Sequence, residues 1–192
     1  MLKQLNSDNQ YGILLSGGLD SAVLLSILIQ ENPGIKIQPF TIPKSDGASL
    51  YANPVVHYIN NKFDKTIPDT ILVGDPTVHH RQQSSTAVKD IFNNYKIDYL
   101  YIGITQNPPE LNNLDGAPLR DKKSTHPQIL FPFVEMYKTD VLNLMYEYHF
   151  EDLIDITHTC TEQQQGRCNR CWQCTERAWA FKQLSKEDTG TL

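Results

Sequence analysis

Residues 16–21 read Ser-Gly-Gly-Leu-Asp-Ser and join a short apolar run to a helical pattern. The run, residues 11–15, has the length and composition of a buried strand. The segment that follows, residues 20–30, is apolar on most faces, as expected of a helix buried against a sheet. A buried strand that leads directly into a buried helix predicts a βαβ unit, and therefore a parallel sheet flanked by helices.

The rest of the chain continues this alternation. Further elements are expected in the following stretches: strands at 35–42, 70–73, 99–104 and 129–133, and helices at 50–63, 81–95 and 141–148. Residues 106–128 are rich in Asn and Pro and lack periodicity, so we expect a long loop, which in a compact domain is usually functional or mobile. A length of 192 residues suits one domain, so we predict a single α/β domain over residues 1–192.

Composition and charge narrow the classes of function. The chain is 40% hydrophobic and 20% charged, which is typical of a globular protein. Its net charge of −5 gives no general attraction to a polyanion, so a large nucleic-acid partner is disfavoured and a small substrate fits better. No apolar stretch approaches the roughly 20 residues of a membrane span, and residues 1–10 lack the apolar core of a signal peptide. We therefore expect a cytoplasmic protein without a membrane partner.

The glycine-rich loop has the chemistry of a phosphate site. Gly17 and Gly18 lack a Cβ, so the backbone can turn sharply and approach a ligand closely. The helix start adds unpaired N–H groups and a positive dipole end, and Ser16 and Ser21 add hydroxyl groups. The alternative is an ordinary turn in which Asp20 or Ser21 caps the helix. The order of these residues, in a strand-to-helix context, favours a site for pyrophosphate.

The cysteines form a second cluster of functional residues, with the spacing C-x7-C-x2-C-x2-C: Cys160, Cys168, Cys171 and Cys174. Four thiolates at this spacing can close a tetrahedral zinc site, and four identical ligands leave no open position, so the site would be structural. An iron–sulfur cluster also takes four thiolates and is the competing interpretation. His158 is near enough in sequence to be an alternative ligand. We predict a zinc-binding subregion at residues 157–184.

The loop resembles the SGGxDS signature of the PP-loop ATP pyrophosphatases, and it matches neither a Walker A loop nor GxGxxG. Together with the C-terminal cysteine motif, it resembles 7-cyano-7-deazaguanine synthase. Positions between the two motifs agree with that family in order: Arg81 with its Gly-Arg-Asn, Gly103 at the end of a strand, Arg120-Asp121 with its Cys-Arg-Asp, Lys138 with its Pro-Leu…Lys, Thr159-Cys160 with its Thr-Cys, and Arg177 with its Cys-x-Leu-Arg.

The resemblance implies a PP-loop fold of the adenine nucleotide alpha hydrolase type, with ATP, Mg²⁺ and Zn²⁺ as cofactors. The implied nucleotide-binding residues are Ser16, Gly17, Gly18, Leu19, Asp20, Ser21 and Gly103. The loop would hold the β,γ-pyrophosphate while a substrate oxygen attacks the α-phosphate, and Asp20 would help to place Mg²⁺. Lys138 and Arg120 would stabilise phosphate or carboxylate charge. Replacing Gly17 with Val should then block ATP turnover with little loss of fold.

The implied reaction adenylates a carboxylated 7-deazaguanine, and ammonia then converts it to an amide and a nitrile. The family also suggests a homodimer. Residues 106–121 should cover the acceptor, with Glu110, Asp115 and Arg120 as its polar partners. The family's acidic stretch after the fourth strand is replaced here by residues 106–110, so the resemblance does not fix the identity of the acceptor substrate. Two alternatives stay open: an RNA-thiolating or RNA-aminating PP-loop enzyme, and a zinc protein that binds nucleotide without consuming it.

Overall fold

The computed structural model describes residues 4–44, 46–78, 80–112, 114–118, 120 and 126–190 of the chain. Within these ranges, the strands are β1 (Gln10–Leu14), β2 (Lys36–Thr41), β3 (Ile71–Leu72), β4 (Tyr99–Ile102) and β5 (Ile129–Leu130). They form one parallel sheet in the order β3-β2-β1-β4-β5. The sheet therefore has β1 at its centre, and the direction of strand addition reverses between β1 and β4.

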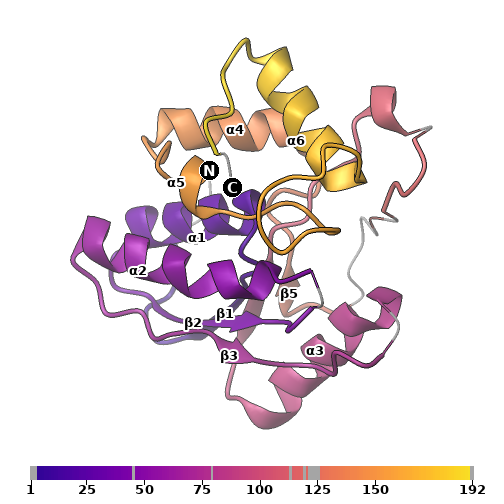
Figure 1. Cartoon of the computed structure of the whole chain (residues 1–192). Coiled ribbons are helices and arrows are strands. Elements are labelled where there is room, and N and C mark those ends of the chain that lie inside the picture. The colour runs from indigo at the N-terminus through magenta and orange to yellow at the C-terminus, as the bar shows by residue number, and fades with distance from the viewer. Residues whose placement is uncertain are drawn as a thin grey trace.

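Helices cover both faces of the sheet. Their bounds are α1 (Leu19–Glu31), η1 (Ala48–Tyr51), α2 (Ala52–Phe63), α3 (His80–Asn94), η2 (Pro109–Leu111), α4 (Lys138–Glu147), α5 (Leu153–Ile156) and α6 (Trp172–Gln183). Helix α3 packs on one face, and α1, α2, α4, α5 and α6 lie on the other (Figure 1). None of the described helices combines the length and the apolar character that crossing a membrane requires.

Strand β1 is predominantly apolar from Tyr11 to Leu14 because both of its faces are covered. Tyr11 and Ile13 belong to the large core under α1, whereas Leu14 belongs to the smaller core under α3. A parallel strand buried on both faces reads as a continuous apolar run, and this is the pattern from which the strand was predicted. The predicted α/β sheet flanked by helices is thus confirmed.

The predicted strand at 129–133 is wrong in length. Its pairing with β4 ends at Leu130, because the carbonyls of Phe131 and Phe133 accept hydrogen bonds from Val134 and Met136 in successive turns. The predicted loop at 106–128 likewise contains one short helix, η2, within its described part.

Candidate active site and cysteine cluster

The glycine loop leaves β1 at the switch point of the sheet, where ligands of open α/β folds bind. Gly17 has φ +79°, and a Cβ there would lie 2.0 Å from the carbonyl oxygen of Ala48 in η1. On the other side, the carbonyl of Gly17 accepts a 2.9 Å hydrogen bond from the N–H of His158. Glycine is therefore required for the fold itself. The prediction that Gly17→Val leaves the fold nearly intact is wrong, since the side chain would collide with the backbone of η1.

The two serines of the loop bond to each other and to the loop backbone. The hydroxyl of Ser21 donates to the carbonyl of Gly18 (3.1 Å) and accepts from the N–H of Ser16 (3.2 Å). The hydroxyl of Ser16 accepts from the N–H of Gly18 at 3.2 Å. The N-cap residue of α1 is Gly18, and no side chain caps the helix among the described residues, so the alternative in which Asp20 or Ser21 caps it is not seen. The N–H groups of its first turn stay free of side-chain caps and can face an anion.

Asp20, in the first turn of α1, has one paired and one unpaired carboxylate oxygen. Its Oδ2 accepts a 2.6 Å hydrogen bond from Nζ of Lys138, the first residue of α4. Its Oδ1 is buried and has no hydrogen-bond partner among the described residues. A buried carboxylate oxygen without a partner is costly, so this atom fits a cation or a donor from a ligand. The side chain thus suits the Mg²⁺ that the resemblance implies.

Lys138 and Arg120 meet at a fourth side chain, Glu176 of α6, which the sequence did not single out. Arg120 donates from Nη1 to Oε1 (2.7 Å) and from Nη2 to Oε2 (2.8 Å), and Nζ of Lys138 lies 3.6 Å from Oε2. The Glu176 side chain is 1% exposed. Burial raises the pKa of Glu176, but the charges and hydrogen bonds of Lys138 and Arg120 outweigh burial and hold it below its ordinary value.

Arg120 was predicted to clasp the carboxylate of a substrate. In the structure the two ends of its guanidinium clasp Glu176 instead, and Nη1 also donates to Oγ1 of Thr105 (2.9 Å) and to the carbonyl of Gln106 (2.9 Å). The structure therefore places Arg120 beside Lys138 and Asp20, but with its paired donors already engaged. Any contact of Arg120 with a substrate stays a prediction.

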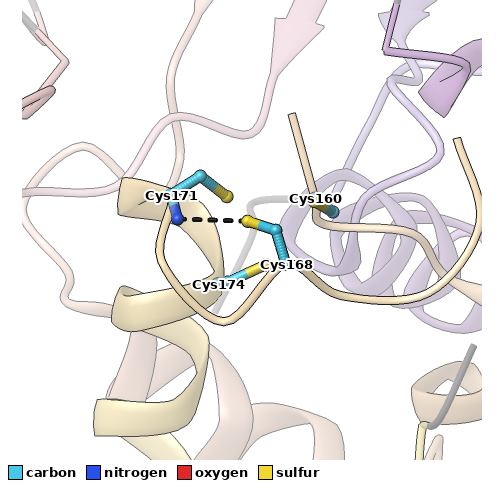
Figure 2. Close-up of side chains that lie close together, drawn as sticks. All are labelled: Cys160, Cys168, Cys171 and Cys174. Atoms are coloured by element: carbon cyan, nitrogen blue, oxygen red, sulfur yellow. Dashed lines mark hydrogen bonds between the residues drawn. The ribbon is translucent and has the colours of Figure 1, made fainter. Parts of the chain in front are cut away.

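The four cysteines gather where the chain enters α6 (Figure 2). Cys171 is the residue before this helix, Cys174 lies in its first turn, and Cys160 and Cys168 come from the preceding segment. Their sulfur atoms all lie within 4.8 Å of one another, and none forms a disulfide. Burial raises the pKa of Cys171, but hydrogen bonds with Thr161 and Cys174 outweigh burial and lower it to about 6. An easily formed thiolate suits a metal ligand.

The spacing of the sulfur atoms bears on the kind of metal centre. Four thiolates around one zinc, at about 2.3 Å each, would stand about 3.8 Å apart. In a [4Fe–4S] cluster each thiolate binds a different iron, so the sulfur atoms stand further apart than around a single ion. The observed arrangement fits one metal ion. Among the described residues, His158 lies outside this group of sulfur atoms. Its Nε2 lies 2.8 Å from the carbonyl of Gln163, and its ring stacks on Tyr51.

Two family models match separate parts of the chain. The family model of queuosine biosynthesis protein QueC matches residues 111–185, and that of asparagine synthase matches residues 1–60. Residues 1–60 contain the glycine loop, and residues 111–185 contain Arg120, Lys138 and the four cysteines. Each model matches less than half of the chain, and together the two matches support a PP-loop superfamily member whose C-terminal part is similar to QueC.

No curated protein matches this PP-loop chain. Among solved structures, it is similar to the U34-tRNA thiolase NcsA from Methanococcus maripaludis, which was solved with its [4Fe-4S] cluster. The similarity covers 94% of this chain and 67% of that chain, at 16% sequence identity and a TM-score of 0.47.

The remaining predicted residues of the PP-loop site lie in different settings. A Cβ on Gly103 would stand 3.2 Å from the backbone of Ser21, so this glycine lets the end of β4 close against the start of α1. A contact of Gly103 with nucleotide stays a prediction. Glu110 and Asp115 are exposed and lie outside the cluster of charges. Asp121 and the side chain of Arg81 lie outside the described part of the chain.

One signal in the sequence could have revealed Glu176. The family's Cys-x-Leu-Arg pattern places a leucine immediately before the arginine, and this chain has Glu176 before Arg177. An acid in place of an apolar residue, on a helix expected to pack on the core, requires a buried cation as its partner. Here the cations are Arg120 and Lys138.

Proposed function

We propose that this PP-loop protein is an ATP-dependent carbon–nitrogen ligase that adenylates the carboxylate of a 7-carboxy-7-deazaguanine-like substrate. One observation carries the proposal. The stretch that matches QueC supplies Arg120 and Lys138, and these side chains converge with Asp20 of the glycine loop at the switch point of the sheet. Ammonia would then convert the adenylate to an amide, and a second activation would give the nitrile.

Each step of this reaction balances. An oxygen of the substrate carboxylate attacks the α-phosphorus of ATP, the bond from that phosphorus to the bridging oxygen breaks, and pyrophosphate leaves. Ammonia attacks the activated carbonyl carbon, AMP leaves, and a proton is lost to give the amide. The amide oxygen then attacks a second ATP in the same way, and loss of AMP and of both amide protons gives the nitrile.

The residues of the chain have separate roles in this proposal. The first-turn N–H groups of α1 bind the β,γ-pyrophosphate. Lys138, buried between Asp20 and Glu176, directs its ammonium toward the charge that develops on the phosphates. Mg²⁺ held by Oδ1 of Asp20 would supply further neutralisation of phosphate charge.

The proposed metal of the cysteine cluster is zinc. Four thiolates leave no coordination position for a substrate, so its role is to fix the start of α6. Loss of the metal should loosen this part of the chain, because the binding free energy of a structural zinc contributes directly to folding.

The decisive experiment is mass spectrometry of the products after incubation with ATP, Mg²⁺, ammonium and 7-carboxy-7-deazaguanine. We expect AMP, pyrophosphate and the amide or nitrile, and no amide or nitrile when ammonium is left out. Release of pyrophosphate only when tRNA replaces the deazaguanine would favour the RNA-modifying alternative. ATP binding without any pyrophosphate release would identify a non-catalytic nucleotide-binding protein.

A further inference from the structure

Glu176 lies between the cysteine cluster and the cationic side chains of the candidate active site. It belongs to α6, two residues after Cys174, and its side chain is 1% exposed. The start of α6 is set by Cys171 and Cys174, which share the cluster with Cys160 and Cys168. The helix that carries Glu176 therefore starts within the cysteine cluster, and it also packs against α4.

The carboxylate binds both terminal nitrogens of Arg120, whose Nη1 also donates to Thr105 and Gln106. Arg120 comes from the long segment between β4 and β5, whose described part contains only the short helix η2. Both of its terminal nitrogens donate to Glu176, at 2.7 and 2.8 Å, in the bidentate geometry that fixes direction as well as distance. The same carboxylate lies 3.6 Å from Nζ of Lys138, which is bonded to Asp20.

We propose that Glu176 is a positioning residue that holds Arg120 and Lys138 beside Asp20, and that the metal-loaded cysteine cluster holds Glu176 in place. Its effect on catalysis rests on the proposed function, whereas its effect on the geometry of Arg120 does not.

Stability alone is a poor explanation for this group of charges. A buried ion pair often contributes little to stability relative to apolar residues of similar volume, because desolvation offsets the attraction between the charges. Removing only Glu176 would leave two cations close together without the anion between them. Arg120 and Lys138 would then repel each other, and only Asp20 would hold Lys138 beside the phosphate site.

NMR of the Arg120 guanidinium tests the geometry directly. In the metal-loaded protein we expect hindered rotation and separately resolved Nη signals, which Arg120→Lys identifies by their loss. Glu176→Gln should merge these signals into one averaged signal, and Glu176→Asp should keep part of the splitting. The control is Glu162→Gln, which removes a surface partner of Arg170 near the cysteines and should leave the Arg120 signals unchanged. Resolved Arg120 signals in Glu176→Gln would overturn the proposal.

Removal of the metal tests the second half of the proposal on the parent chain, so it does not depend on whether a variant folds. Chelation should merge the Arg120 signals, and added zinc should restore them. Signals that stay resolved after complete metal removal would show that the cysteine cluster does not control Glu176.

Kinetics then separate a positioning role from a structural one. In Glu176→Gln we expect kcat to fall on the order of 10²-fold with KM for ATP little changed, since small displacements of catalytic groups cost about this much. Glu176→Asp should recover most of the loss. An unchanged kcat in Glu176→Gln would overturn the catalytic part of the proposal. If the parent protein releases no pyrophosphate with any acceptor, the proposed function fails, while the NMR outcomes still decide the role of Glu176.

Discussion

Nζ of Lys138 lies 2.6 Å from Oδ2 of Asp20, although 118 positions separate the two residues in sequence. The contact joins the first residue of α4 to the first turn of α1, next to the glycine loop. Both side chains are largely buried, with exposed fractions of 6% and 17%. The contact therefore places a desolvated ammonium group at the N-terminus of α1, where the N–H groups of the first turn can bind a phosphate.

The first prediction concerns this ammonium group. Lys138→Met keeps much of the side-chain volume but removes the charge, so we expect kcat for pyrophosphate release to fall on the order of 10²- to 10³-fold. Zinc content should stay unchanged, because Lys138 is not one of the four residues that would bind the metal. Stopped-flow or steady-state pyrophosphate assays would measure the loss, and a kcat within a few-fold of the parent would exclude Lys138 from the chemistry.

The glycine loop gives a second prediction, in which two neighbouring glycines behave differently. Gly17→Ala should destabilise the fold by about 1–3 kcal/mol, since Gly17 has a positive φ and no space for a Cβ beside Ala48. Gly18 has φ −86°, and a Cβ there would meet its neighbours at 3.3 Å or more. Gly18→Ala should therefore destabilise the fold less than Gly17→Ala and bind ATP more weakly.

Thermal melts and calorimetric titration with ATP would measure these effects. Gly34→Ala is the matched control, because a Cβ at this position meets nothing within 4 Å. A melting temperature of Gly17→Ala equal to that of Gly34→Ala would contradict the structural role of Gly17. Undiminished ATP affinity in Gly18→Ala would remove the loop from the phosphate site.

The third prediction concerns the metal. Purified protein should contain about one zinc per chain and show no visible absorption from an iron–sulfur cluster. Cys171→Ser should lower the melting temperature, because metal binding stabilises the local fold. Elemental analysis after anaerobic purification is the measurement, and stoichiometric iron in place of zinc would support the RNA-thiolating alternative.

The fourth prediction concerns stability at high pH. Burial, with smaller contributions from Tyr11 and Tyr99, raises the pKa of Tyr101 to about 12. Its folded-state pKa lies above the unfolded value of about 10, so the neutral phenol stabilises the fold fully below pH 10. This contribution is lost as pH rises from about 10 to 12. Denaturant unfolding at pH 9 and pH 11 should show a smaller loss in Tyr101→Phe than in the parent, and equal losses would contradict the assignment.

Local features of the sequence predicted much of this molecule. The strand, glycine loop and first helix are contiguous, and three of the four cysteines lie within one short stretch, so spacing alone indicates which residues meet. The signature residues also occur in the order that the PP-loop superfamily requires. These parts of the fold and site depend on short-range geometry.

The charged cluster could not be predicted in the same way. Arg120 and Glu176 are 56 positions apart, and Lys138 and Asp20 are 118 apart. Packing of α4 on α1 and of α6 on α4, with the segment between β4 and β5, brings them together. Closeness in sequence can also suggest a contact that the structure does not have. His158 was considered as an alternative metal ligand because it lies two positions before Cys160. Its ring instead stacks on Tyr51, and its backbone N–H bonds to Gly17.

The last prediction separates the three polar residues that were expected to bind the acceptor. Glu110 and Asp115 are exposed and lie outside the charged cluster, so Glu110→Ala and Asp115→Ala should leave stability within about 0.5 kcal/mol of the parent. Arg120→Ala leaves Glu176 buried with only the more distant Lys138 as a partner, so we expect a loss of about 3 kcal/mol and a large fall in kcat/KM. Denaturant unfolding and steady-state kinetics with the deazaguanine would measure both effects. A kcat/KM within about twofold of the parent for all three variants corresponds to under 0.5 kcal/mol of transition-state free energy, and the segment would then not contact the acceptor.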